Sequence, residues 1–233
     1  GMLTMSMLYQ YSEDFMLVLS HDVVVHGKGS MYGKIPGDHQ DKLSTLRLTY
    51  GFMAAHPGKK LLFMGQEFGQ IREWSEEREL DWQLLDPVDG QESGHEKLRQ
   101  FVSYLNVFYQ AHPALYVNDT KPSGFQWLST LDADNSVIVF LRKCKDETLL
   151  ITCNFTPVYH EKFKVGVPFA GKYKEILNSD AVEFGGGGHV NPRVKNSKRE
   201  KWDGKPNSIE IKLAPLSVQV FQCTKVAVKR KKA

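Results

Sequence analysis

Two short apolar runs in the first part of the chain predict buried strands. Residues 15–19 (Phe-Met-Leu-Val-Leu) form the first run, and residues 60–64 (Lys-Leu-Leu-Phe-Met) repeat the pattern. Continuous runs of this length are typical of parallel strands that helices cover on both faces. We therefore expect each run to form a strand that is buried on both sides.

Two helices are predicted by apolar residues that recur at spacings of three and four. The first stripe contains Leu43, Leu46, Tyr50, Met53 and Ala54, and a His-Pro-Gly breaker at 56–58 ends it. The second contains Leu98, Phe101, Val102, Leu105, Phe108 and Tyr109, and it ends before Pro113. A loop over 66–94, rich in charge and tryptophan, is too long for a simple connection. The order strand, helix, strand, helix is typical of an α/β fold with a parallel sheet.

The pattern changes near Tyr116. Short strand-like runs follow, separated by Asp, Asn, Gly and Pro; they lie at 125–128, 136–143, 148–154, 163–167, 173–177, 208–213 and 217–221. Such spacing predicts an antiparallel β-sandwich, with Trp127 in its core. We expect an α/β part over 2–115, a β-sandwich domain over 116–224 and a basic tail over 225–233. The glycine-rich stretch 185–207 is predicted to be a long mobile loop.

Composition and charge argue against several classes of protein, among them nucleic-acid-binding, disulfide-rich and membrane-spanning proteins. The 233 residues include 41% hydrophobic and 24% charged positions, as in ordinary globular proteins. The net charge of +3 rests partly on the tail, so it does not indicate a nucleic-acid-binding face. Cys144, Cys153 and Cys223 suit neither disulfides nor zinc, which favours a reducing cytoplasm. We expect no leader peptide, membrane span, metal or cofactor.

The segment 20–30 carries the chemistry that is easiest to interpret. It follows the first predicted strand and contains His21 and Asp22. In α/β barrels the active site lies where the strands end, so polar groups there have a positional reason to be catalytic. The alternative is that His21 and Asp22 only cap a turn and bond to each other. A phosphate-binding loop is rejected, because Asp22 stands where that motif needs a glycine.

At this point the chain resembles the glycogen-branching enzymes of the α-amylase superfamily. The resemblance covers nearly the whole sequence and is carried by 6–9 (Ser-Met-Leu-Tyr), 20–22, 24–30, 56–65, 67–70, 72–74, 80–82, 84–86, 177–180 and 184–186. It implies that this stretch corresponds to the last part of a (β/α)8 TIM barrel, followed by the carboxy-terminal β-sandwich. The nucleophile and the acid/base of such an enzyme would then lie upstream of this stretch.

The resemblance also implies residue roles. Asp22 matches a third carboxylate that binds sugar hydroxyls in the transition state, and His21 matches a donor to the same sugar. Trp74, Trp82 and Lys28 are candidates for substrate binding, and the alternative for both tryptophans is packing within their loop. Val23 departs from the family, which has Glu there.

Other polar residues receive structural interpretations. Glu67 is expected to brace neighbouring loops through hydrogen bonds. His56, His95 and His112 are expected at helix ends, where caps and dipole contacts are the usual roles.

Three functions follow for comparison. The first is a carboxy-terminal fragment of a 1,4-α-glucan branching enzyme, inactive alone, whose partner is an α-glucan. The second is a non-catalytic glucan-binding or structural module. The third, nucleic-acid binding through the basic tail, ranks last. Because two barrel strands cannot close a barrel, we also expect self-association through exposed barrel edges, or poor ordering of the first hundred residues.

Overall fold

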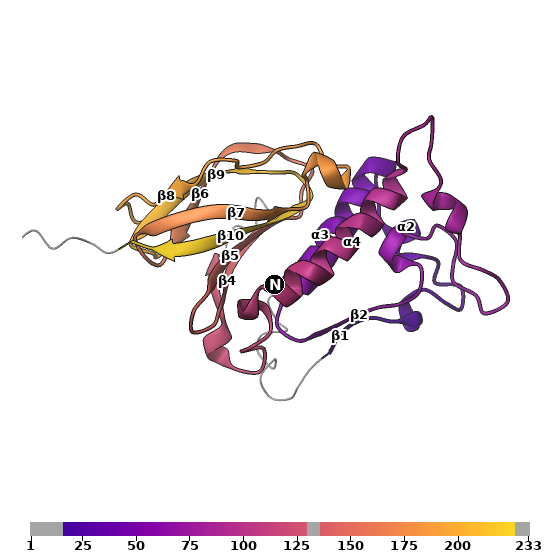
Figure 1. Cartoon of the computed structure of the whole chain (residues 1–233), viewed down its shortest axis with the longest axis horizontal. Coiled ribbons are helices and arrows are strands. Elements are labelled where there is room, and N and C mark those ends of the chain that lie inside the picture. The colour runs from indigo at the N-terminus through magenta and orange to yellow at the C-terminus, as the bar shows by residue number, and fades with distance from the viewer. Residues whose placement is uncertain (1–15, 130–135, 227–233) are drawn as a thin grey trace, which may run out of the picture.

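The computed structural model describes residues 16–129 and 136–226, which form layers of strands and helices. A parallel pair of strands lies on one side of two long helices, and a six-stranded sheet lies on the other (Figure 1). A two-stranded sheet covers the far face of the larger one. Phe15, the motif at 6–9 and most of the predicted basic tail lie outside the described residues, whereas Lys225 is the last residue of a strand.

The first part of the chain alternates strands and helices as predicted. Strand β1 (Met16–Leu19) pairs in parallel with β2 (Lys59–Leu62), with Met16 opposite Lys59 and Leu19 opposite Leu62. The helices are α2 (Met31–Lys34), α3 (His39–Ala55) and α4 (Gly94–Ala111). Short 3-10 turns are η2 (His21–Val23), η3 (Gln66–Phe68), η4 (Trp82–Leu85), η5 (Pro113–Leu115), η6 (Pro122–Gly124) and η7 (Val182–Phe184).

Local sequence explains where the two long helices begin and end. The Asp38 side chain accepts a hydrogen bond from the backbone N–H of Asp41 at the start of α3. The Ser93 side chain accepts one from the backbone N–H of Glu96 at the start of α4. Each cap pairs an N–H group that has no partner within its helix. Helix α3 ends at Ala55 because Pro57 cannot continue it. His56, His95 and His112 lie at helix ends, as predicted.

The second part is the predicted antiparallel sandwich. Its larger sheet has the order β3-β4-β5-β10-β7-β8, and its smaller sheet pairs β6 with β9. The strands are β3 (Phe125–Ser129), β4 (Val137–Lys143), β5 (Thr148–Asn154), β6 (His160–Val167), β7 (Gly171–Asn178), β8 (Lys195–Asn196), β9 (Asn207–Leu213) and β10 (Ser217–Lys225). The two-residue β8 has no signal in the sequence pattern. The others match the predicted runs.

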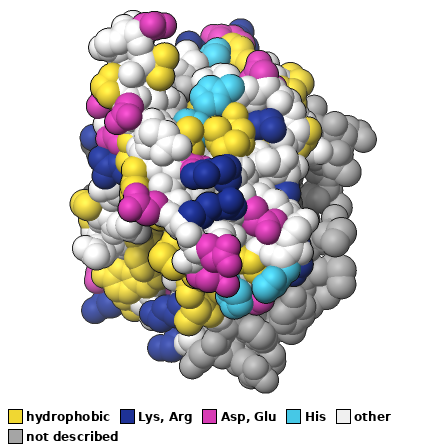
Figure 2. All heavy atoms as spheres, turned by 90° about the vertical axis from the view of Figure 1, so that its right-hand side faces the viewer, with side chains coloured by type: hydrophobic (Ala, Val, Ile, Leu, Met, Phe, Trp, Pro, Cys, Tyr) yellow, Lys and Arg dark blue, Asp and Glu magenta, His cyan; other side chains and the backbone are white. Residues whose placement is uncertain are grey.

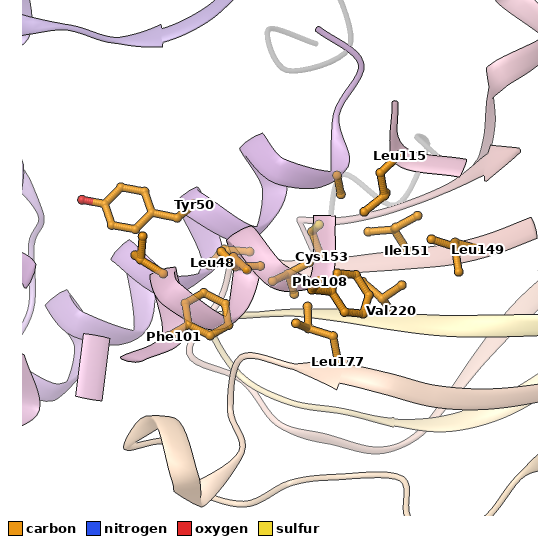
Figure 3. Packing of buried hydrophobic residues seen from close by; sticks show 14 of the residues in the cluster. Leu48, Tyr50, Phe101, Phe108, Leu115, Leu149, Ile151, Cys153, Leu177 and Val220 are labelled. Carbon is orange, nitrogen blue, oxygen red and sulfur yellow. The ribbon is translucent and has the colours of Figure 1, made fainter. Parts of the chain in front are cut away.

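Helices α3 and α4 share one hydrophobic core with the large sheet. Figure 3 shows Leu48, Phe101 and Phe108 from the helices against Ile151 and Val220 from the strands. A second cluster lies between the large sheet and β6–β9. Gly51 marks the close approach of α3 to β10, because a Cβ there would overlap Val218 Cγ1. The α/β part and the sandwich are thus packed together by a common core.

Two expectations on burial are corrected. Strands β1 and β2 are not buried on both faces: Met16 and Val18 are 52% and 49% exposed, because helices cover only one side of this pair. Trp127 packs on the helix side of the large sheet, against Phe125 and Phe140, and not inside the sandwich.

The stretch 185–207 differs from the predicted mobile loop, because buried polar groups of its neighbours hold it. The Asp180 carboxylate accepts hydrogen bonds from the N–H groups of Gly187 (2.8 Å) and His189 (3.0 Å). Glu175 accepts from the N–H of Asn191 at 2.8 Å. Arg47 of α3, which is 1% exposed, donates through Nε to the Ser179 carbonyl at 2.9 Å and so fixes the start of this region.

Candidate functional site

The loops that follow β1 and β2 meet at one end of the molecule. The two strands are parallel, so their carboxyl ends lie at the same edge, and the loops 20–30 and 63–94 leave from there. Figure 2 looks at this end and shows basic, acidic and histidine side chains gathered around small apolar patches. This is the edge at which α/β barrels place their active sites.

His21 and Asp22 lie in the 3-10 turn η2, directly after β1. His21 Nε2 lies 3.2 Å from Asp22 Oδ1, and both side chains are exposed, at 56% and 74%. The Ser20 hydroxyl donates to Asp22 Oδ2 at 3.3 Å, and the His21 ring lies 5.9 Å from that of Phe63. The two side chains do contact each other, as the structural alternative expected. Their exposure nevertheless leaves a carboxylate and an imidazole open to a ligand.

Two lysines hold the backbone of this turn. Lys28 Nζ donates to the carbonyl of Asp22 at 2.7 Å, and Lys34 Nζ donates to the carbonyl of Val23. Lys28 is thus adjacent to the His21–Asp22 pair, although it contacts the backbone of Asp22 instead of its carboxylate. Val23 itself is half-buried at the end of η2.

Glu73 joins the two loops, and its carboxylate is the brace that the sequence analysis assigned to Glu67. Its Oε1 accepts from Gly27 N–H at 2.9 Å, and its Oε2 accepts from Gly29 N–H at 2.6 Å. Both glycines have positive φ, of 78° and 71°, which glycine adopts without strain. The two N–H groups lower the pKa of Glu73, so the carboxylate stays ionised at neutral pH.

Glu67 has a different place. It lines a cavity between α3, β2 and α4, and its charge helps to raise the pKa of Tyr50, although burial of that phenol has the larger effect. Both glutamates follow β2 in the sequence, so their positions alone do not show which of them holds the loops. The residues that identify Glu73 are its two glycine partners, about 45 residues earlier in the sequence.

The remaining part of the second loop is anchored by Asp81, which is 2% exposed. Its carboxylate pairs with Arg72, whose Nε lies 2.5 Å from Oδ1, and this contact lowers the pKa of Asp81. The N–H of Asp81 donates to Gln70 Oε1 at 3.1 Å. Ser30 Oγ donates to the carbonyl of Ile71 at 2.7 Å, a further tie between the loops.

The two tryptophans differ in how open they are. Trp74 is half-buried, and its ring meets Phe63 edge-on, with ring centres 5.0 Å apart. Its backbone N–H donates to the carbonyl of Val24 at 3.2 Å. It therefore packs within the loops, beside the His21–Asp22 turn. Trp82 is 50% exposed and lies against Phe68, with ring centres 5.3 Å apart. Within the described residues no contact links Trp82 to that turn.

Comparisons with known proteins agree with this architecture. The family described as "Alpha amylase, C-terminal all-beta domain" matches residues 127–224. A 1,4-alpha-glucan branching enzyme GlgB from Oceanobacillus iheyensis is 48% identical over 94% of this chain, and one from Aquifex aeolicus is 48% identical over 93%. The chain corresponds to the carboxy-terminal part of the 1,4-alpha-glucan branching enzymes. It spans about a third of the length of these curated relatives, 34% in both.

Solved structures support the same fold. An α-amylase from H. orenii matches 88% of this chain and 38% of its own, with a TM-score of 0.53 and 15% identity. AmyP in complex with maltose matches 85% of this chain and 38% of its own, with a TM-score of 0.52 and 17% identity. The GlgB relatives confirm the branching-enzyme resemblance of the sequence, and the solved structures confirm the fold of a partial barrel followed by a β-sandwich.

The described residues contain no cluster of three or more metal-ligating side chains. No helix in the same ranges is long and apolar enough to cross a membrane. The loops that follow β1 and β2 expose the Asp22 carboxylate, the His21 imidazole and the Trp82 indole, and Glu73 and Asp81 hold these loops.

Proposed function

We propose that this chain supplies one wall of the α-glucan site of a 1,4-α-glucan branching enzyme. Such an enzyme cleaves an α-1,4 link and transfers the released chain to a 6-hydroxyl. The observation that carries the proposal is the exposed His21–Asp22 pair at the carboxyl end of β1, in a chain 48% identical to GlgB relatives. The AmyP structure with maltose lends support for an α-glucan ligand.

Asp22 and His21 receive roles that fit their geometry. The Asp22 carboxylate accepts hydrogen bonds from sugar hydroxyls, and these bonds strengthen as the sugar ring gains positive charge in the transition state. His21 donates to a hydroxyl of the same sugar. Lys28 holds the turn through the Asp22 carbonyl, and Trp82 offers an open indole face on which a glucose ring stacks.

Two further carboxylates of these loops, those of Glu73 and Asp81, are not suited to proton transfer. Glu73 and Asp81 both have a lowered pKa, through the Gly27 and Gly29 amides and through Arg72, so they stay ionised at neutral pH. A retaining mechanism needs a protonated carboxyl group and a nucleophile about 5 Å apart. We therefore expect the 233-residue chain alone to neither branch nor hydrolyse amylose.

A fusion tests the role of Asp22 directly. The amino-terminal two-thirds of the Oceanobacillus iheyensis relative are joined to this chain, and branching of amylose is followed by iodine staining and by reducing ends. We expect Asp22→Asn to lower kcat by about 10²–10³-fold. Asp86→Asn is the control, because Asp86 is an exposed aspartate at the end of η4. Full activity of the Asp22 variant would contradict the proposal.

The second candidate, glucan binding without catalysis, is favoured by the exposed Trp82. Affinity electrophoresis of the purified chain in gels with and without amylose measures it. We expect Trp82→Ala to remove the amylose-dependent retardation. Trp202→Ala is a matched control, since Trp202 is 44% exposed in the sandwich domain. Equal retardation of both variants would exclude a glucan contact at Trp82.

We also propose that the chain self-associates through β1 and β2. In the described part of the chain these strands pair only with each other, and Met16 and Val18 of β1 expose apolar surface. We expect the double change Met16→Thr and Val18→Thr to raise the dissociation constant in sedimentation by about tenfold. Val107→Thr, at a 65% exposed position of α4, is the control. A parent chain that stays monomeric at all concentrations contradicts this proposal.

Free cysteines support a cytoplasmic location. Cys144, Cys153 and Cys223 are all unpaired, and a reducing compartment keeps thiols in this state.

A further inference from the structure

The turn that carries His21 and Asp22 combines exposed side chains with a backbone whose carbonyls are all engaged. Each carbonyl from residue 20 to residue 24 accepts a hydrogen bond, from a backbone N–H or from a lysine ammonium group. In chain order the donors belong to Val23, Val24, Lys28, Lys34 and Trp74. The backbone of this surface turn is therefore fixed, while the imidazole and the carboxylate stay open to a ligand.

The two lysines hold the turn in different ways. Lys28 belongs to the same loop, six residues after Asp22, so it moves with that loop. Lys34 is the last residue of α2, which is anchored elsewhere: the hydroxyl of Ser30, the cap of α2, donates to the carbonyl of Ile71 at 2.7 Å. Lys34 thus links the turn to the loop that follows β2.

The contacts of Lys34 show that it acts on the backbone. Its ammonium group donates to the carbonyl of Val23, at the end of η2, where a 3-10 turn leaves carbonyls without an internal donor. The Asp22 carboxylate has other neighbours, the Ser20 hydroxyl at 3.3 Å and His21 Nε2 at 3.2 Å. Lys34 therefore affects the carboxylate through the peptide that follows Asp22, and not through a direct ion pair.

We propose that Lys34 is a positioning residue for Asp22, an inference that rests on the proposed function. By holding the Val23 carbonyl, Lys34 fixes the direction in which the Asp22 carboxylate meets the sugar. A misplacement of about 1 Å costs up to about 100-fold in rate, because the contact is needed in the transition state. A long glucan has contacts elsewhere on the enzyme, so its binding in the ground state should depend little on Lys34.

The first test uses the fusion with the amino-terminal two-thirds of the Oceanobacillus iheyensis relative. We expect Lys34→Met to lower kcat about tenfold and to leave the KM for amylose within about twofold. Lys34→Arg keeps a long side chain with a charged donor, so it should restore most of the lost kcat. Lys121→Met is the control, because Lys121 is an exposed lysine at the start of η6.

The second test needs no activity and uses the purified 233-residue chain. The N–H groups of Val23 and Val24 close the turn, at 3.3 and 2.8 Å from the carbonyls of Ser20 and His21. In Lys34→Met both amide protons should exchange with solvent about tenfold faster, while denaturant unfolding stays unchanged. Lys121→Met should exchange like the parent chain.

The outcomes separate this inference from the proposed function. Parent-like exchange at Val23 and Val24 in Lys34→Met shows that the lysine does not hold the turn, and it overturns the inference. A parent-like kcat of Lys34→Met, in a fusion where Asp22→Asn is impaired, overturns the inference alone. A KM that rises while kcat stays constant also contradicts it, because Lys34 would then act in glucan binding. Full activity of Asp22→Asn overturns the proposed function and the inference together.

Discussion

Strands β1 and β4 have similar apolar sequences but very different surroundings. All residues of β4 from Val137 to Arg142 are buried, whereas β1 alternates between exposed and half-buried side chains. Strand β4 has helices on one face, the β6–β9 pair on the other and paired strands on both edges. Strand β1 has one partner, β2. The difference shows that an apolar run predicts a strand, but does not predict whether other elements of the chain pack against both of its faces.

The two regions also differ in how charge is used. Between the helices and the sheet, charged side chains are enclosed: Arg142 is fully buried and donates to the carbonyls of Ala55 (2.6 Å) and Leu115 (2.8 Å), and it pairs with Asp119. At the end of the β1–β2 layer, charges such as Asp22 and Glu73 stay on or near the surface. We therefore expect substitutions in the enclosed region to affect stability and those in the open region to affect local order or binding.

The largest expected effect is loss of the buried cation. Arg142→Met leaves Asp119 and two carbonyls buried without their donor, and we expect it to lower the free energy of unfolding by about 3–5 kcal/mol. Denaturant unfolding measures this change. Arg99→Met is the matched control, because Arg99 forms an exposed pair with Glu96 at 2.7 Å within α4, a contact contributing at most about 0.5 kcal/mol. Equal losses in the two variants would remove the contrast between the regions.

A smaller effect is expected where α3 touches the sheet. Gly51→Ala adds a methyl group that overlaps Val218, so we expect a loss of about 1–3 kcal/mol in spite of the better helix propensity of alanine. Val218→Ala makes room, and the double variant should recover about 1 kcal/mol of that loss in a double-mutant cycle. Additive effects of the two changes would show that the helix does not approach the sheet closely at this point.

Much of the fold could be predicted from the sequence, because most of its elements depend on local patterns. The stripes at Leu43–Ala54 and Leu98–Tyr109 fix two helices, and proline ends both. The sequence pattern does not show which other segments pack against a given helix or strand. The exposure of Met16 and the side of the sheet on which Trp127 packs both depend on layers formed by distant segments.

The candidate site shows the same limit. The position of His21 and Asp22 after a strand was predictable, since strand ends place loops at one edge. The domain boundary between residues 115 and 116 stays a prediction. The roles of Arg142 and Glu73 were missed, because their partners lie 23 or more residues away in the sequence. Long-range hydrogen bonds of single polar residues leave no periodic signal.

The smallest expected effect is local and concerns the loop that carries Asp22. Glu73→Ala removes the acceptor for Gly27 and Gly29 N–H, so the amide protons of both glycines should exchange with solvent faster, while denaturant unfolding stays nearly unchanged. Glu76→Ala is the control, because Glu76 is an exposed glutamate in the same loop.

The same contact predicts a pH dependence with a definite sign. Because folding lowers the pKa of Glu73 below 4.5, its contribution to loop order is present above that pH and is lost as the pH falls through the lowered pKa. In a parent-chain NMR titration, the Gly27 and Gly29 amide signals should therefore shift together, with one midpoint below 4.5. Signals that titrate separately, or with a midpoint at or above 4.5, would show that Glu73 does not hold the loop in solution.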